Sequence, residues 1–383
     1  MHLTRPYWRC PACGRTCAPA DTAWELPPGN ASWGVRAAAA LVGALVPSFA
    51  QAAELLATLT PIQVSARALE TFTEAVGQAY TLPAPPATPP TPDLLVVQCD
   101  GGMVHMRPSQ WQEMKALLVY RRDAGEDQPP QRAVVQGPWA EQDTLLLTLA
   151  TREGLAHAKQ VLCLADGARA IWPLLARCFP TAFFLLDWYH LMEHISAVAA
   201  LLPEGTAWRE TQATALWEVG PRPTLRALLA LQREDTLPAA TQEAARACFT
   251  YLWHNRHRVD YAEARRRGFP CGSGRIESTI KATVQARAKG PGMRWAPAHV
   301  QAVLNVRCAI ENGDFALACA QAKAAARPAT ALSGPRAPLR GPGVPAQHPH
   351  PPARPTRQVA TPRPPDLSLT QAARIVKGAV HLG

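Results

Sequence analysis

Long apolar runs are missing from this 383-residue chain. The best candidate, residues 37–50, is alanine-rich, short and interrupted by Pro47. A membrane-spanning helix needs about 20 consecutive apolar residues, so this stretch predicts an ordinary helix of a globular protein. No signal peptide is recognisable either. We therefore expect no membrane partner.

Cysteines at the regular spacings of a disulfide framework are also missing. The ten cysteines are scattered, and several, such as Cys99, Cys163 and Cys178, fall in apolar runs. They predict reduced, buried thiols in a cytoplasmic protein. Acidic residues are fewer than basic ones, 29 against 39, which leaves a net charge of +10. This excess predicts a polyanionic partner, with nucleic acid as the first candidate.

A second CxxC motif is absent, so the first one forms only half of a zinc site. Cys10 and Cys13 flank a turn, and only Cys17 lies near enough to be a third ligand. A structural zinc needs four ligands, usually from two such pairs. We interpret residues 1–30 as the remnant of a zinc knuckle, in which Cys10 and Cys13 bind zinc poorly. A turn that carries no metal is the alternative.

The length predicts about two to three domains. Residues 31–81 have a helical pattern, and the break at Pro61 is typical of a helix-turn-helix, although Arg67 is almost the only basic residue of its second helix. A plain helical hairpin is the alternative. Residues 82–92 are rich in Pro and Thr and predict an extended linker. Residues 327–383 are rich in Pro, Ala and Arg, and we expect a mostly disordered tail.

The central part of the chain has the pattern of an α/β domain. Strands are expected at residues 94–99, 114–121, 133–136, 161–165 and 182–186, with helices at 141–157 and 171–179. Three strands followed by helix, strand, helix and strand is the order of a ribonuclease-H-like sheet. We predict such a mixed sheet, flanked by helices, built from residues 93–190 and 271–326. Residues 191–270 lack strand patterns and predict an all-helical insertion between the two parts.

Three carboxylates follow the ends of predicted strands. Parallel sheets carry their chemistry at the carboxyl ends of the strands. A ribonuclease-H-like fold places one carboxylate on its first strand and another at the end of its fourth, and here these positions hold Asp100 and Asp166. Gly167 lets the chain turn away from Asp166. Asp187 follows the fifth strand and predicts a helix cap or, alternatively, a further metal ligand.

A further candidate carboxylate, Glu277, falls in the first turn of a helix that Ser273 could cap. Basic residues and a tryptophan follow it, which suits DNA strands near a reaction centre. These candidate DNA contacts are Arg275, Lys281, Arg287, Lys289, Arg294 and Trp295.

Transfer of a phosphodiester needs two metal ions, one that activates the attacking oxygen and one that stabilises the leaving oxygen. Mg²⁺ prefers hard oxygen ligands. Asp100, Asp166 and Glu277 could therefore hold two Mg²⁺ or Mn²⁺ ions. His190 and His194, spaced i and i+4, could also bind a metal but lack a third ligand.

Five segments in a fixed order resemble the ISKra family of DDE insertion-sequence transposases. They are residues 100–115, 164–172, 179–195, 272–278 and 287–295, and the resemblance extends over about residues 7–313. It implies that Asp100, Asp166 and Glu277 are the catalytic carboxylates of a ribonuclease-H-like core. Asp187 and His190 match a motif of related transposases and are accessory candidates for local order or DNA contact.

The family further implies Mg²⁺-dependent cleavage and rejoining of transposon ends. The expected partners are transposon ends and target DNA, bound by a homo-oligomer in the bacterial cytoplasm, at the nucleoid. Family members usually carry an earlier Cys pair that this chain lacks, which favours the alternative of a decayed, non-catalytic DNA-binding protein. A metal-dependent nuclease that does not rejoin strands is a third possibility.

Overall fold

The structure is a computed structural model that describes residues 7–11, 16–17, 27, 31–124 and 128–326. Cys13 and the tail at residues 327–383, both subjects of predictions, lie outside these residues. Near the N-terminus, β1 (Trp8–Arg9) pairs antiparallel with β2 (Thr16–Cys17), and Cys10 is exposed just after β1. None of the helices in the described part of the chain has the length and apolar character needed to cross a membrane.

The region after β2 contains the helices α2 (Trp33–Leu45), α3 (Phe49–Leu59) and α4 (Ala66–Ala79). Each begins at a serine, Ser32, Ser48 or Ser65, whose hydroxyl accepts a hydrogen bond from the amide three residues later. The helix α4 contacts α2, α3, α14 (Pro297–Glu311) and α15 (Phe315–Ala325). Because α4 is packed on several sides, the arrangement favours a structural helix over a free DNA-reading helix.

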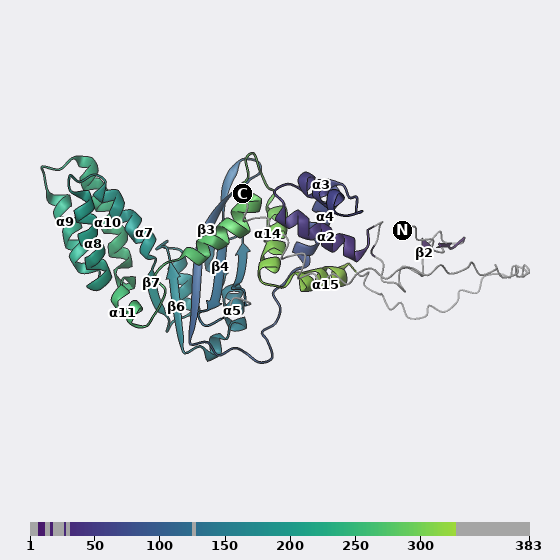
Figure 1. The fold of residues 1–383 in the computed structure, drawn as a ribbon, viewed down its shortest axis with the longest axis horizontal. Coiled ribbons are helices and arrows are strands. Elements are labelled where there is room, and N and C mark those ends of the chain that lie inside the picture. Colours follow the sequence, from purple (N-terminus) through teal and green to yellow (C-terminus); the bar gives the residue numbers. More distant parts are fainter. Residues whose placement is uncertain (1–6, 12–15, 18–26, 28–30, 125–127, 327–383) are drawn as a thin grey trace, which may run out of the picture. The chain divides into compact units, whose positions relative to one another are not determined.

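The centre of the chain forms a five-stranded mixed sheet flanked by helices, with strand order β5-β4-β3-β6-β7 (Figure 1). β3 pairs antiparallel with β4 and parallel with β6, while β5 and β7 form the edges. The α/β fold expected from the sequence is thus confirmed. The strands are β3 (Leu94–Met106), β4 (Gln110–Arg121), β5 (Gln131–Val135), β6 (Gln160–Ala165) and β7 (Phe183–Leu186).

The strand β3 is longer than the sequence suggests. The apolar pattern predicts a strand that ends at Cys99, but β3 continues to Met106, paired with β4 as a hairpin. Gly101 and Gly102 lack side chains where Glu113 and Ile280 pack, so the ladder passes through them. The prediction that the strand ends at residue 99 is wrong. The two glycines do not form a turn; they leave room for neighbouring side chains to pack closely against the strand.

Helices cover both the faces and the ends of the sheet. The single helix expected at residues 141–157 is divided into η1 (Trp139–Glu141), α5 (Asp143–Arg152) and η2 (Leu155–His157). The helix α6 (Ile171–Cys178) links β6 to β7 and buries Ile171, Leu174 and Leu175, as its apolar spacing predicts.

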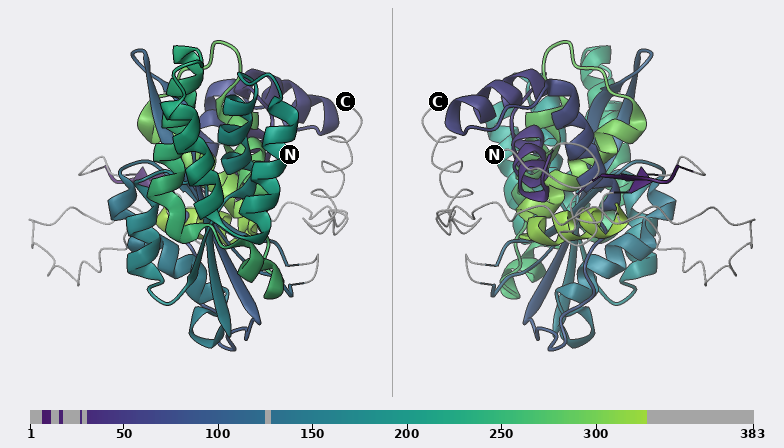
Figure 2. Two further views of the ribbon diagram at one scale, coloured as in Figure 1. Left: turned by 90° about the vertical axis from the view of Figure 1, so that its left-hand side faces the viewer. Right: turned by 90° about the vertical axis from the view of Figure 1, so that its right-hand side faces the viewer.

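The chain after β7 contains helices and no strand between residues 188 and 270, all of which the structure describes. This secondary structure agrees with the expected all-helical composition. The helices lie beyond the β7 edge in Figure 1, and Figure 2 shows them in front of the sheet when viewed from that side. They are α7 (Trp188–Ala199), α8 (Gly205–Glu218), α9 (Pro221–Arg233), α10 (Ala239–Asn255), η3 (Arg256–Arg258) and α11 (Tyr261–Arg266).

The chain then returns to the sheet as one helical segment with a π-helical middle. It consists of α12 (Gly274–Thr279), the π-helical η4 (Ile280–Gln285) and α13 (Ala286–Ala288). α12 contacts β3 and β4, and η4 contacts β3. A π-helical turn often marks a functional site. Here it begins three residues after Glu277.

Candidate active site

The sheet places two of the three predicted carboxylates side by side. In the parallel ladder of β3 and β6, Cys99 is opposite Ala165. Asp100 and Asp166 are the next residues on these neighbouring chains, and both are half-buried. Adjacent strands lie about 4.8 Å apart. The register thus brings the two carboxylates to the same end of the sheet.

Glu277 reaches the same place from above the sheet. The fully buried Gln98 accepts a hydrogen bond of 3.0 Å from the amide of Ile276 through its Oε1 atom. Gln98, Asp100 and Gly102 share one face of β3 because side chains alternate along a strand. Gly102 on that face lies against Ile280 of η4. The Glu277 helix is therefore anchored over the face of β3 that carries Asp100.

The other two carboxylates act electrostatically on Asp100. Burial first, and then the negative charges of Asp166 and Glu277, together raise the pKa of Asp100 to about 6. The Gly101 amide, 2.6 Å from Asp100 Oδ1, and the charge of His190 act in the opposite direction. Asp100 thus carries a negative charge that its surroundings only partly compensate, which is the situation that a bound cation would relieve.

The three carboxylates do not form a tight cluster. Among the described residues, the one group of three or more His, Cys, Asp or Glu ligand atoms within 4.8 Å of one another is a different one. In a two-metal site the ions lie about 3.5–4 Å apart. With Mg²⁺ bonds of about 2.0–2.1 Å, carboxylates on different ions can lie about 8 Å apart. The open arrangement is therefore compatible with two ions and less so with one ion bound by all three carboxylates.

A tight turn fixes the position of Asp166. Gly167 has φ +92, and a side chain there would lie 2.8 Å from the Tyr251 hydroxyl and 2.9 Å from Leu186. Asp166 Oδ1 accepts from the Ala168 amide at 2.9 Å. Tyr251 of α10 donates to the Asp166 carbonyl oxygen at 2.6 Å. The sequence predicted the role of Gly167, but Tyr251 lies 85 residues away and gave no local signal.

Asp187 is a buried structural residue. It caps α7, and its Oδ1 accepts from the amide and the Nδ1 atom of His190 at 2.7 and 2.9 Å. Its Oδ2 accepts from the Ser273 amide. Burial alone would raise the pKa of Asp187, but the hydrogen bonds from His190 and Ser273 outweigh it and lower the pKa. Both oxygens are in use, so the geometry favours the cap over the alternative of a metal ligand.

The two histidines of α7 face different partners. The hydrogen bond to Asp187 raises the pKa of His190 to about 9 against the effect of burial, and the charge of Asp166 contributes. His190 is therefore a cation beside the carboxylates. His194 stacks on Tyr251 at 3.8 Å, and burial lowers its pKa. The two rings therefore have separate structural partners, and they belong to no three-ligand group among the described residues.

Ser273 connects Asp187 to the third carboxylate. It is the N-cap residue of α12, which begins at Gly274, but its hydroxyl makes no capping bond to the helix amides. Its Oγ donates to Glu277 Oε1 at 3.2 Å. The expected capping role of the Ser273 hydroxyl is therefore wrong, because its backbone, with φ −86 and ψ 12, lacks the extended conformation typical of a capping residue.

Four of the six predicted DNA contacts are exposed on the segment that carries Glu277 and on the loop that follows it. These are Arg275, Lys281, Lys289 and Arg294, and the Arg275 guanidinium lies 4.2 Å from the centre of the Tyr120 ring. Their exposure leaves them able to meet a phosphate backbone.

The other two predicted DNA contacts, Arg287 and Trp295, need correction. Arg287 is 1% exposed, donates through Nε to the Gly43 carbonyl oxygen at 2.9 Å, and lies over the rings of Phe49 and Trp295. Trp295 is 9% exposed and donates to the Ala288 carbonyl oxygen. Arg287 joins the N-terminal helix α2 to the core, and the Trp295 ring packs against Arg287, so neither side chain can reach DNA in this structure.

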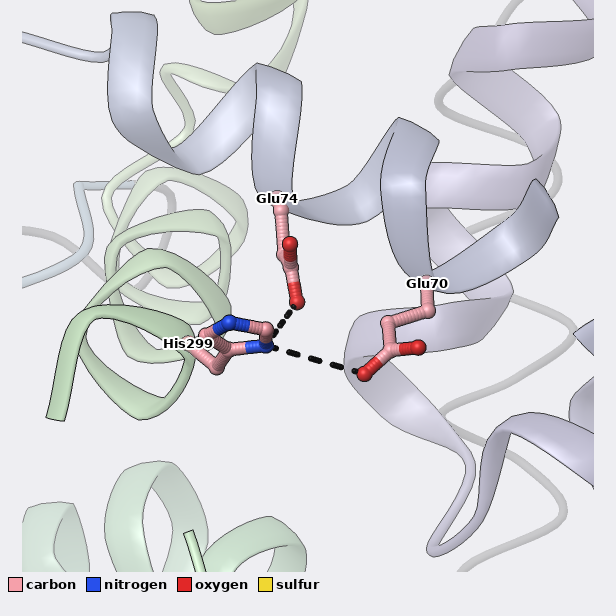
Figure 3. A group of neighbouring side chains, drawn as sticks. All are labelled: Glu70, Glu74 and His299. Carbon is pink, nitrogen blue, oxygen red and sulfur yellow. Dashed lines mark ion pairs between the residues drawn. The ribbon is translucent and has the colours of Figure 1, made fainter. Parts of the chain in front are cut away.

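A second candidate metal site, which the sequence did not reveal, joins α4 to α14 (Figure 3). His299 Nδ1 lies 2.6 Å from Glu74 Oε1 and 3.7 Å from Glu70 Oε1. These three residues form the group within 4.8 Å and could hold a metal ion. Arg67 also pairs with Glu70, at 2.7 Å. The i, i+4 spacing of the two glutamates was visible in the sequence, but the histidine that completes the group lies more than 200 residues away.

Comparison with known proteins adds no family. No family model matches the chain, and no curated protein gives a significant match. The case for a function therefore depends on the carboxylates, the sheet and the basic residues described above.

Proposed function

We propose that this protein is a DDE-type transposase that cleaves and joins DNA strands at the ends of an insertion sequence, with Asp100, Asp166 and Glu277 as its metal ligands. The observation that carries the proposal is that the fold brings these three carboxylates to the same region of the sheet. Asp166 directly follows β6, Asp100 lies within β3 just past the last pair of the β3–β6 ladder, and Glu277 comes from a helix anchored on β3. We further infer that the sheet is ribonuclease-H-like. An antiparallel β3-β4-β5 unit, followed by parallel β6 and β7 on the other side of β3, supports this inference.

The donor set suits Mg²⁺ or Mn²⁺. All three residues offer hard carboxylate oxygens, and the pKa of Asp100 is raised by burial and by the negative charges of Asp166 and Glu277. Two bound ions would activate the attacking oxygen and stabilise the leaving oxygen. Asp100, Asp166 and Glu277 would be the residues that hold these ions. The Gly167 turn presents Asp166, and Ser273 orients Glu277.

His190 adds a positive charge beside this centre. Asp187 keeps the imidazole charged and oriented, which offsets part of the repulsion among the carboxylates. In the proposed enzyme, Asp187 and His190 are therefore positioning residues rather than metal ligands. This division of roles assigns the second ligand position to Asp166.

DNA is the proposed partner, as transposon ends and as target. The net charge of +10 and the exposed Arg275, Lys281, Lys289 and Arg294 support contact with phosphates. We include assembly as a homo-oligomer on DNA in the proposal, because the resemblance to insertion-sequence transposases implies it.

The test first searches the genomic sequence on both flanks for inverted repeats, and then uses the purified full chain with DNA that carries them. Cleavage is expected with Mg²⁺ or Mn²⁺ and not with a chelator, and strand joining is followed with a supercoiled target. Asp235→Asn, an exposed aspartate between α9 and α10, is the matched control and should remain active. Cleavage that persists in excess chelator contradicts the proposal. Cleavage without joining indicates a nuclease, and binding without cleavage under either metal indicates the non-catalytic alternative.

A further inference from the structure

The C-terminal end of α10 packs against the loop that contains Asp166. Tyr251 donates to the Asp166 carbonyl oxygen, and Arg169, three residues after Asp166, places its Nη2 atom 2.8 Å from His254 Nε2. The last turns of α10 therefore contact the loop that carries the proposed metal ligand. Trp253, Arg256 and His257 lie within three residues of His254 along the chain.

This end of α10 carries an exposed aromatic ring with a cation on it. Trp253 is 46% exposed, and the Arg256 guanidinium lies 4.1 Å from the centre of its ring. Arg256 is held there by a hydrogen bond of 2.6 Å from Nη1 to the Trp253 carbonyl oxygen. Phe249 supports the indole in a parallel stack, with ring centres 6.0 Å apart.

The surroundings of Trp253 are mostly basic. We define the α10 surface as Arg169, Trp253, His254, Arg256 and His257, of which all but the half-buried Arg256 are exposed. The nearest exposed acidic side chain on the adjoining helix α7 is Glu193, which influences Tyr251 and His194. A single indole among arginines and histidines is unlike the contiguous apolar centre of a protein–protein interface.

We propose that the α10 surface binds an unpaired stretch of DNA next to the cleaved bond. A base would stack on Trp253 in place of the Arg256 guanidinium, which would turn to meet phosphates together with Arg169. This proposal rests on the proposed function, because it names the form of DNA that the site receives. An unpaired strand fits better than a duplex, since only an unstacked base exposes its flat face to an aromatic ring.

The surface also explains why a helical insertion lies between the strand β7 and the Glu277 helix. Its helix α10 supplies Tyr251, which fixes the Asp166 loop. The aromatic and basic residues that would hold the strand begin two residues later, at Trp253. The same element thus couples the geometry of the metal ligand to the position of its substrate.

The test measures the affinity of the full chain, in chelator, for two labelled DNAs of equal length by fluorescence anisotropy. One is a perfect duplex, and the other has an unpaired overhang. Wild type should prefer the overhang DNA. Trp253→Ala should bind the overhang DNA at least about fivefold more weakly and the duplex within about twofold of wild type. Trp253→Phe, which keeps an aromatic ring, should restore most of the preference.

Two controls make the result specific. Trp111→Ala removes a similarly exposed tryptophan, 56% exposed on the β3-β4 hairpin, and Arg233→Gln removes an exposed arginine of α9. Both should keep the overhang preference, whereas Arg256→Gln should reduce it. Equal affinity of wild type for the two DNAs, or an unchanged preference in Trp253→Ala, overturns the proposal. Because binding is measured without metal, loss of the preference in Trp253→Ala supports the surface even if the protein never cleaves DNA.

Discussion

Asp100→Asn should stabilise the metal-free protein while abolishing cleavage. The pKa of Asp100 is raised from 3.8 to about 6, so the folded state favours the protonated form. Below the pKa of the unfolded state, about 4, the raised pKa of the folded state does not change the free energy of unfolding. As the pH rises from about 4 through about 6, the folded protein loses stability because Asp100 ionises less readily in it than in the unfolded chain. The full shift corresponds to about 3 kcal/mol. Because Asp100 is only half-buried, solvent screening reduces the expected gain of the variant to about 1–2 kcal/mol.

The assay is urea unfolding of wild type and Asp100→Asn, in chelator and in Mg²⁺, at pH 4 and pH 7.5. In chelator the variant should be the more stable protein at pH 7.5 and gain nothing at pH 4. At a hundredfold excess over its Kd, Mg²⁺ should stabilise wild type by about 2.7 kcal/mol and the variant far less. Glu74→Gln, in the second candidate metal site, controls for binding elsewhere. A variant that is less stable than wild type in chelator at pH 7.5 refutes the reasoning.

Four further changes test the supports of the site and the roles assigned to two basic residues. Asp187→Asn should lower stability by about 2–4 kcal/mol near neutral pH. The pKa of His190 is raised to about 9, so the Asp187–His190 pair stabilises the protein fully below pH 6.5 and loses this effect as the pH rises through 9. Between pH 6.5 and 9 the free energy of unfolding of the variant should therefore depend less on pH than that of wild type. Gly167→Ala should cost about 1–2 kcal/mol for the left-handed backbone alone and should depress cleavage, measured as initial rate. Arg287→Ala should lower the free energy of unfolding by about 2–4 kcal/mol, whereas Lys281→Gln should weaken DNA binding in a gel shift without changing the unfolding midpoint.

The sequence was most informative where structure follows from local pattern. The apolar runs before Asp166 and Asp187 specify the parallel strands β6 and β7, and the carboxylates fall where such strands end. These features depend on residues close together in the chain. The positions of Asp100 and Asp166 side by side then followed from the order of the strands.

Features that depend on distant partners could not be predicted. The basic residue Arg287 gives the same local signal as its exposed neighbour Lys289, and only the packing of α2 against the core decides which of them is buried. The role of Tyr251 likewise depends on how α10 folds back onto the Asp166 loop. The continuation of β3 beyond Asp100 depends on the partner strand and on η4, which accept its two glycines.

The most direct test of the central claim compares Asp166→Asn with Asp187→Asn in cleavage of end-containing DNA. Both substitutions keep the shape of the side chain and remove its charge. Asp166→Asn should abolish Mg²⁺-dependent cleavage while gel-shift affinity for the same DNA stays near that of wild type. Asp187→Asn, measured per folded molecule, should retain cleavage at a reduced rate. Near wild-type cleavage by Asp166→Asn, together with inactive but folded Asp187→Asn, would contradict the account and exchange the roles of the two carboxylates.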